Sequence, residues 1–167
     1  MDASMQNRGD DGEGGGEYLT FVLGSEEYAV DILRVQEIRG YEPPTRIANA
    51  PAFIKGVANL RGTIIPIIDL RIKLNMPKVE YTAFTVTMIL NVAGIVVGVV
   101  VDQVSDVVAL SSQQIMMPPD FSASFDTKYI TGLANIDKRM LIVIDIDRLF
   151  SSGEFGVIAQ QLDSQAA

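Results

Sequence analysis

Residues 54–74 read IKGVANLRGTIIPIIDLRIKL, and a similar stretch, ITGLANIDKRMLIVIDIDRLF, occupies residues 130–150. With a constant offset of 76 and no gaps, six of the 21 positions are identical and seven more exchange one apolar residue for another. Apolar periodicity alone does not place glycine, asparagine and aspartate at matched positions, so the sequence predicts two similar small β subdomains. The identical pairs are Ile54 with Ile130, Gly56 with Gly132, Ala58 with Ala134, Asn59 with Asn135, Ile68 with Ile144, and Asp69 with Asp145.

The segments around this repeat favour short strands joined by turns, which is typical of an all-β sandwich or barrel. Pro66 places its strand at an edge or a bulge, because proline cannot donate to a sheet ladder. Helical turns are expected only at Ile32–Arg34, Leu70–Leu74 and Arg148–Phe150, and in the tail after Glu154. Strands are predicted at Tyr18–Leu23, Tyr28–Val30, Val35–Ile38, Phe53–Leu60, Thr63–Ile68, Phe84–Val92, Ile95–Val101, Ile130–Ala134 and Met140–Ile144.

Residues 81–101 carry no charge, and a stretch of this length can span a bilayer. Threonines interrupt it, valine and isoleucine dominate it, and residues 91–94 (NVAG) have turn chemistry near its middle. These features favour a buried β-hairpin over a membrane helix.

The chain contains no histidine, no cysteine and no tryptophan. Catalytic triads, thiol nucleophiles, zinc fingers and haem ligand pairs are therefore excluded, and enzymes that use carboxylates remain open, with Asp69, Asp102 and Asp145 as candidates. A structural role is the alternative for the repeated residues. Gly56 and Gly132 permit a bulge or a close approach, and Asp69 and Asp145 can each cap the helical turn that follows a strand. No metal-ligand spacing surrounds these aspartates, so we expect no catalytic residue, no metal and no cofactor.

The net charge of −8 is unevenly distributed: residues 1–17 carry −4, residues 18–78 carry +2 and residues 79–167 carry −6. An acidic chain disfavours binding to nucleic acid or to an anionic membrane. Residues 1–16 form a glycine-rich acidic lead that is expected to be disordered, and they lack the pattern of a secretory signal, which makes the cytoplasm the expected location.

Several segments together resemble one family, the bacterial chemotaxis adaptor CheW. Each is a weak motif alone, but their order and spacing over residues 17 to about 150 make a specific match. They are DILRVQEIR at 31–39, FIKGV at 53–57, NLRG at 59–62, PIIDLR at 66–71, VDQV at 101–104 and YITGL at 129–133.

The resemblance implies a fold and a function. The fold is two intertwined SH3-like five-stranded β-barrels on a shared core, with a C-terminal helix, so that residues 17–153 form a single domain and 154–167 its helical tail. The function is non-catalytic: the family couples the cytoplasmic hairpin tip of transmembrane chemoreceptors (methyl-accepting chemotaxis proteins) to the regulatory domain of the histidine kinase CheA. The protein would be cytoplasmic, would be recruited to membrane-associated receptor arrays, and would not insert into the membrane.

The resemblance also implies two sets of contact residues. In the family the receptor tip docks in a groove between the barrels, and a groove of aliphatic side chains rimmed by an arginine suits a helical hairpin. Ile32, Val35 and Ile38 could equally be core residues, and Arg61 could form a salt bridge with Glu37. For the kinase, the matching positions are Gly56 and Phe121. The receptor-binding positions are Ile32, Val35, Ile38, Asn59, Leu60, Arg61, Gly62 and Val107.

Two alternatives remain open at this level: an isolated regulatory domain of the kinase, which has the same fold in the family, and an enzyme that depends on carboxylates. The length, the acidic lead and the helical tail favour the free-standing adaptor.

Overall fold

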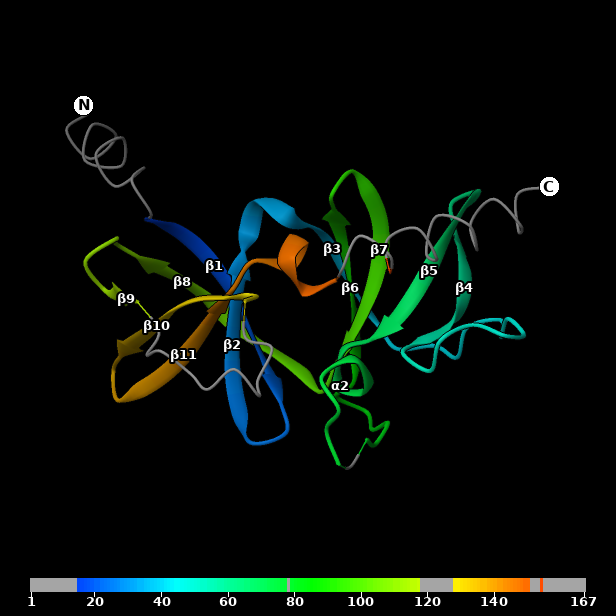
Figure 1. The fold of residues 1–167 in the computed structure, drawn as a ribbon, viewed down its shortest axis with the longest axis horizontal. Coiled ribbons are helices and arrows are strands. Elements are labelled where there is room, and N and C mark those ends of the chain that lie inside the picture. The colour runs from blue at the N-terminus through cyan, green and yellow to red at the C-terminus, as the bar shows by residue number, and fades with distance from the viewer. Residues whose placement is uncertain (1–14, 78, 118–127, 151–153, 155–167) are drawn as a thin grey trace. The chain divides into compact units, whose positions relative to one another are not determined.

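The computed structural model describes residues 15–77, 79–117, 128–150 and 154 (Figure 1). The chain is all-β, as predicted, and forms two compact SH3-like units. Unit 1 consists of Met1–Ile32 and Ser105–Leu149, and unit 2 of Leu33–Val104 and Phe150–Ala167. The chain therefore leaves unit 1 after its second strand, builds the strands of unit 2, and then returns to complete unit 1.

Unit 1 contains a six-stranded sheet in which β2 and β11 are parallel, with Ala29 opposite Val143, whereas β1 and β2 are antiparallel. The sixth strand, β9, has only two residues, so the expected five-stranded barrel gains a short extra edge. In spatial order the strands are β8 (Gln103–Leu110), β1 (Gly16–Leu23), β2 (Glu26–Asp31), β11 (Arg139–Ile144), β10 (Ile130–Ile136) and β9 (Ile115–Met116).

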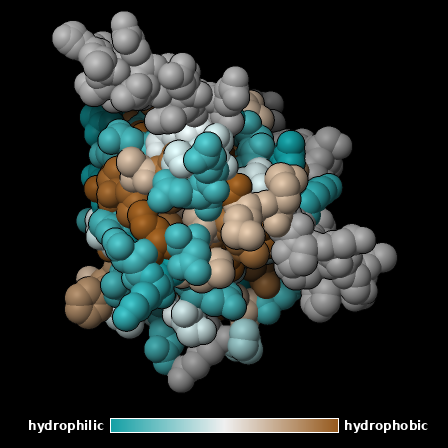
Figure 2. Space-filling view, turned by 90° about the vertical axis from the view of Figure 1, so that its left-hand side faces the viewer, coloured by the Kyte–Doolittle hydropathy of each residue, from teal (hydrophilic) through white to brown (hydrophobic). Residues whose placement is uncertain are grey.

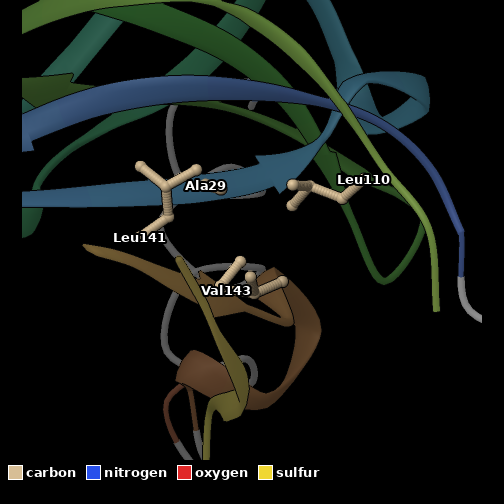
Figure 3. Packing of buried hydrophobic residues seen from close by; sticks show 5 residues of the cluster. Ala29, Leu110, Leu141 and Val143 are labelled. Carbon is tan, nitrogen blue, oxygen red and sulfur yellow. The ribbon is translucent and has the colours of Figure 1, made fainter. Parts of the chain in front are cut away.

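One cluster of aliphatic side chains forms the core of unit 1. Ala29, Leu110, Leu141 and Val143 point toward one another from β2, β8 and β11 (Figure 3). Ala134 belongs to the same buried cluster. Because these strands come from both ends of the chain, burial of their apolar surface stabilises the pairing of segments that are distant in sequence.

Unit 2 contains a five-stranded sheet in which β5 and β7 are parallel. The predicted hairpin at 84–101 is present as β6 and β7, with a tight turn at Ala93 and Gly94. In spatial order the strands are β3 (Val35–Gly40), β6 (Val86–Val92), β7 (Ile95–Val101), β5 (Thr63–Asp69) and β4 (Ile54–Leu60).

The sequence repeat corresponds to a structural repeat with the same offset. The hairpin β4–β5 and its helix α2 (Leu70–Lys73) match β10–β11 and the 3-10 helix η2 (Ile146–Leu149). Each hairpin has a register shift at its glycine, Gly56 in β4 and Gly132 in β10. Asp69 accepts a hydrogen bond from the backbone N–H of Arg71, and Asp145 accepts one from the backbone N–H of residue 147, so both aspartates cap the next turn.

Some expectations differ from the structure. Of the two positions predicted for Pro66, the edge is wrong, because β5 is an interior strand, whereas a register shift does lie next to it, at Gly56 opposite Ile67. Pairing of β5 with β7 begins only at Ile67, so the missing N–H is not required. Phe84 is exposed in a turn, and β6 begins at Val86. The predicted tail helix and Phe121 lie outside the described residues.

No helix in the described part of the chain is both long and apolar enough to cross a membrane.

Candidate functional site

The β4–β5 turn presents Arg61 at the edge of unit 2. Arg61 and Gly62 adopt φ values of 51° and 91°, which fit the two-residue hairpin turn between Leu60 and Thr63. The Asn59 side chain accepts a hydrogen bond of 2.7 Å from the N–H of Gly62 and so fixes the turn. The Arg61 side chain is 70% exposed.

Arg61 also forms the salt bridge with Glu37 that the sequence left as an alternative. Glu37 lies on β3 and Arg61 follows β4, so the pair connects the two edge strands of the sheet in unit 2. The hydrogen bond from Arg61 holds the pKa of the Glu37 carboxyl below its usual range. Since the guanidinium has five N–H donors, this pair leaves Arg61 able to bind a second acceptor.

A bulge in β3 decides which side chains share a face. Val35 pairs with Leu90 and Ile38 with Met88, and the register shift between Val35 and Glu37 brings these two apolar residues to one face although they are three positions apart. Glu37 pairs with Ile89 and therefore lies on the opposite face. Val35 is half-buried and Ile38 is exposed, so this edge offers aliphatic surface on one face and the Arg61–Glu37 pair on the other.

Leu60 differs from its neighbours in the turn, because its side chain is buried with Ile65, Ile67, Ile89 and Val100. It supports the turn from the core of unit 2 and presents little surface to a partner.

Ile32 and Val107 belong to unit 1. Ile32 begins the 3-10 helix η1 (Ile32–Arg34) and is half-buried, and Val107 is exposed on the edge strand β8. Leu33 is 87% exposed and is the apolar residue that sequence reasoning missed. Its position in a three-residue helical turn was the available signal, since neighbours in such a turn point in different directions.

A network of polar side chains fixes β8 next to Val107. The hydroxyl of Thr20, which is fully buried, donates to Asp106 Oδ1 at 2.5 Å and accepts from the N–H of Asp106 at 3.1 Å. Arg139 donates to Asp106 at 3.0 Å and to Glu27 at 2.5 Å. Hydrogen bonds from Arg139 and Thr20 lower the pKa of the Asp106 carboxyl. Four strands, β1, β2, β8 and β11, thus meet in one ion-pair cluster.

Gly56, matched to a kinase contact, is buried beneath another segment. Its φ is +151°, and a Cβ atom at this position would lie 2.0 Å from the carbonyl oxygen of Thr45. Thr45 forms two backbone hydrogen bonds with Val57, of 2.9 and 2.8 Å, so the segment before β4 closes over the glycine. The absence of a side chain at Gly56 permits this contact, and the outer surface here belongs to the segment around Thr45.

The carboxylates considered for catalysis have structural partners. Burial opposes ionisation of Asp69, but hydrogen bonds from Arg71 and Tyr81 outweigh it and hold the pKa of this carboxyl below its usual range. Asp102 accepts a hydrogen bond of 2.7 Å from Arg71, and Asp145 caps its turn. Within the described ranges no group of three acidic side chains could hold a metal ion.

The fold defines a class of protein, one built from two small β-barrel units. The chain belongs to the CheW family, because the model of the CheW-like domain matches residues 17–154. It is 54% identical to the chemotaxis protein CheW of Klebsiella aerogenes over 144 residues, which cover 86% of this chain and 87% of that protein. It is 38% identical to CheW of Rhizobium meliloti over 141 residues, covering 84% and 91% of the two chains.

A solved structure supports the same family assignment. The crystal structure of the scaffolding protein TtCheW from Thermoanaerobacter tengcongensis matches with a TM-score of 0.76 and 32% identity, over 84% of this chain and 95% of that one. The chain is thus a chemotaxis scaffolding or adaptor protein, and none of these names describes a catalytic activity.

Proposed function

We propose that this protein is a non-catalytic cytoplasmic adaptor that couples the cytoplasmic tips of chemoreceptors to the regulatory domain of CheA at membrane-associated arrays. Membership in the CheW family supports the adaptor role. The observation that carries the receptor contact is the edge of unit 2, which exposes Ile38 on one face of strand β3 and Arg61, paired with Glu37, on the other.

We assign receptor contacts to residues within each unit. In unit 2, Val35 and Ile38 supply aliphatic surface, and Asn59, Arg61 and Gly62 supply the polar turn. In unit 1, Ile32 and Val107 supply further aliphatic surface. Leu60 belongs to unit 2, where it supports the turn from the core. A helical hairpin with apolar ridges and carboxylate or amide groups has the complementary chemistry.

The kinase contacts are assigned to Gly56 and Phe121. Because Gly56 is buried, we assign its contact to the segment around Thr45 that it seats. The second kinase contact is assigned to Phe121 from the family resemblance.

The direct test is co-sedimentation of the purified protein with receptor-bearing membranes and CheA. We expect the protein to bring CheA into the membrane pellet and to raise its autophosphorylation in a receptor-dependent way. A protein that does neither is not the adaptor.

Charge reversal Arg61→Glu is expected to weaken receptor binding by about tenfold or more, because it removes a cation at the contact and replaces it with a repelling charge. The unfolding midpoint and the affinity for CheA should remain those of the wild type, since the Arg61 side chain is largely exposed. Co-sedimentation measures the first quantity, and urea unfolding and titration with CheA measure the others.

Arg148→Glu is the matched control, because this arginine is also exposed and also pairs with a local acid, Asp145. The swap Glu37→Arg with Arg61→Glu re-forms the salt bridge with reversed charges and should not restore receptor binding. Simultaneous loss of the fold, kinase binding and receptor binding in Arg61→Glu would show that Arg61 is structural.

A further inference from the structure

Unit 1 has an apolar outer face on the three strands β9, β10 and β11. Figure 2 views the side of the molecule where β9 and β10 are labelled in Figure 1 and shows apolar side chains exposed among polar ones. Three of the exposed large apolar residues of unit 1 are methionines: Met116 is 65% exposed, Met117 81% and Met140 54%.

The strand register places two of these methionines on one face. Met116 pairs with Leu133, and Leu133 pairs with Ile142 on its other side, so the three side chains share a face of the sheet. Met140 lies two residues before Ile142 in the same strand and therefore points the same way. The opposite face carries Ala134 and the rest of the core cluster, so the methionine face is the outer one.

The strand that carries Met116 is weakly held. β9 has two residues and pairs only with β10, at the edge of the sheet. Its backbone passes directly over Gly132, where a Cβ atom would lie 2.8 Å from the carbonyl oxygen of Met116. A short edge strand of this kind leaves the thioether of Met116 open to solvent and to small oxidants.

We propose that Met116, Met117 and Met140 form a peroxide-sensitive modification site, at which oxidation to methionine sulfoxide weakens the kinase contact of this end of unit 1. Each thioether sulfur takes one oxygen atom from hydrogen peroxide, whose other oxygen leaves as water, so the sulfur is oxidised and the peroxide is reduced. The product is polar where the thioether was apolar. Thiol-dependent methionine sulfoxide reductases reverse the step.

The functional part of this inference rests on the proposed function. Phe121, the second proposed kinase contact, follows Met117 by four residues in the sequence. An apolar partner surface that docks here loses contact when these exposed side chains become polar, and we expect CheA binding to weaken by about fivefold or more.

The first measurement is the order of oxidation. The adaptor alone is treated with a low dose of hydrogen peroxide, the peroxide is removed with catalase, and peptide mapping by mass spectrometry follows each methionine. Met116, Met117 and Met140 should be oxidised well before Met88, which is fully buried and serves as the internal reference. Oxidation of Met88 at the same rate as these three would overturn the site.

The second measurement is titration of the treated protein with the CheA regulatory domain. Wild type should bind more weakly after treatment and recover after incubation with the reductase. The triple Met→Leu variant at these positions keeps the apolar volume, so it should bind like untreated wild type and be insensitive to peroxide. The triple Met→Gln variant should bind CheA weakly without any oxidant. Met76→Leu is the control, and its CheA binding should still weaken after peroxide treatment.

The outcomes separate the two proposals. Equal CheA binding by oxidised and untreated wild type would overturn the functional effect. The same conclusion would follow if peroxide treatment lowered the CheA affinity of the triple leucine variant as much as that of the wild type. If untreated wild type does not bind CheA, the proposed function fails, while the order of oxidation still decides whether the site exists.

Discussion

Replacement of Arg71 by methionine is expected to lower the free energy of unfolding by about 3–5 kcal/mol, because it leaves a buried carboxylate without its counter-ion. Arg71 is 1% exposed and Asp69 is 0% exposed. The guanidinium donates to both oxygens of Asp69 at 2.9 Å, to Asp102 at 2.7 Å and to the carbonyl of Glu80 at 2.6 Å. Tyr81 donates to Asp69 at 2.6 Å and completes the cluster. Urea unfolding followed by circular dichroism measures the loss.

Two variants sharpen this experiment. Asp69→Asn combined with Arg71→Met removes both charges and should recover part of the stability that Arg71→Met loses alone. Asp145→Asn changes the aspartate equivalent to Asp69 in the repeat, which is partly exposed and pairs loosely with Arg148 at 3.4 Å, so it should cost about 1 kcal/mol or less. A loss below about 1 kcal/mol in Arg71→Met would contradict the role of the cluster.

The same cluster predicts a dependence on pH. The pKa of Asp69 is lower in the folded protein than in the unfolded chain, so its ionised form favours folding. This contribution is complete above the unfolded pKa of about 4 and is lost as the pH falls through the folded value. The free energy of unfolding should therefore decrease below about pH 4 in the wild type and decrease less in Asp69→Asn, as measured by urea unfolding across this range.

Gly56→Ala is expected to lower the free energy of unfolding by about 2–3 kcal/mol and to weaken CheA binding by about tenfold or more. The added methyl group overlaps the backbone of Thr45 rather than a flexible side chain, and the φ of +151° adds strain. The segment around Thr45 must therefore shift, and with it the proposed kinase contact. Urea unfolding and titration with CheA measure the two effects, and receptor binding should change much less.

Gly40→Ala is the matched control, because Gly40 has no atom within 4 Å of the added position and no positive φ. It should leave stability within about 0.5 kcal/mol of the wild type and CheA binding unchanged. If Gly56→Ala destabilises the protein while its folded form binds CheA normally, the contact lies elsewhere.

The repeat made much of this fold predictable. A constant offset of 76 identified the paired hairpins, their glycines and their capping aspartates, because each feature has a local physical cause. The hairpins need a tight turn, the glycines permit a close approach of the backbone, and the aspartates cap the start of a helical turn. Strand β8 was missed because its exposed residues, among them Gln103, Ser105 and Asp106, hide the apolar alternation of an edge strand. β9 has too few residues for any periodic signal.

The candidate site was predictable only in part. The exposure of Arg61 followed from its position in a turn, and the salt bridge with Glu37, which was the alternative interpretation, is present. The burial of Leu60 and the contact of Gly56 with Thr45 depend on how distant segments close over β4. Burial of a charged residue such as Arg71 also contradicts the usual preference, and only the partners that folding assembles around it make it favourable.

The interruption of unit 1 by unit 2 has a consequence for synthesis on the ribosome. The strands that the structure describes in unit 2 lie between residues 35 and 101, so they can pair while the rest of the chain is still being made. β2 must wait for β11, the parallel partner that follows it by the entire length of unit 2. A nascent chain that stalls before Ile144 keeps an unpaired edge at β2, so truncated products should be prone to aggregation and should depend on chaperones.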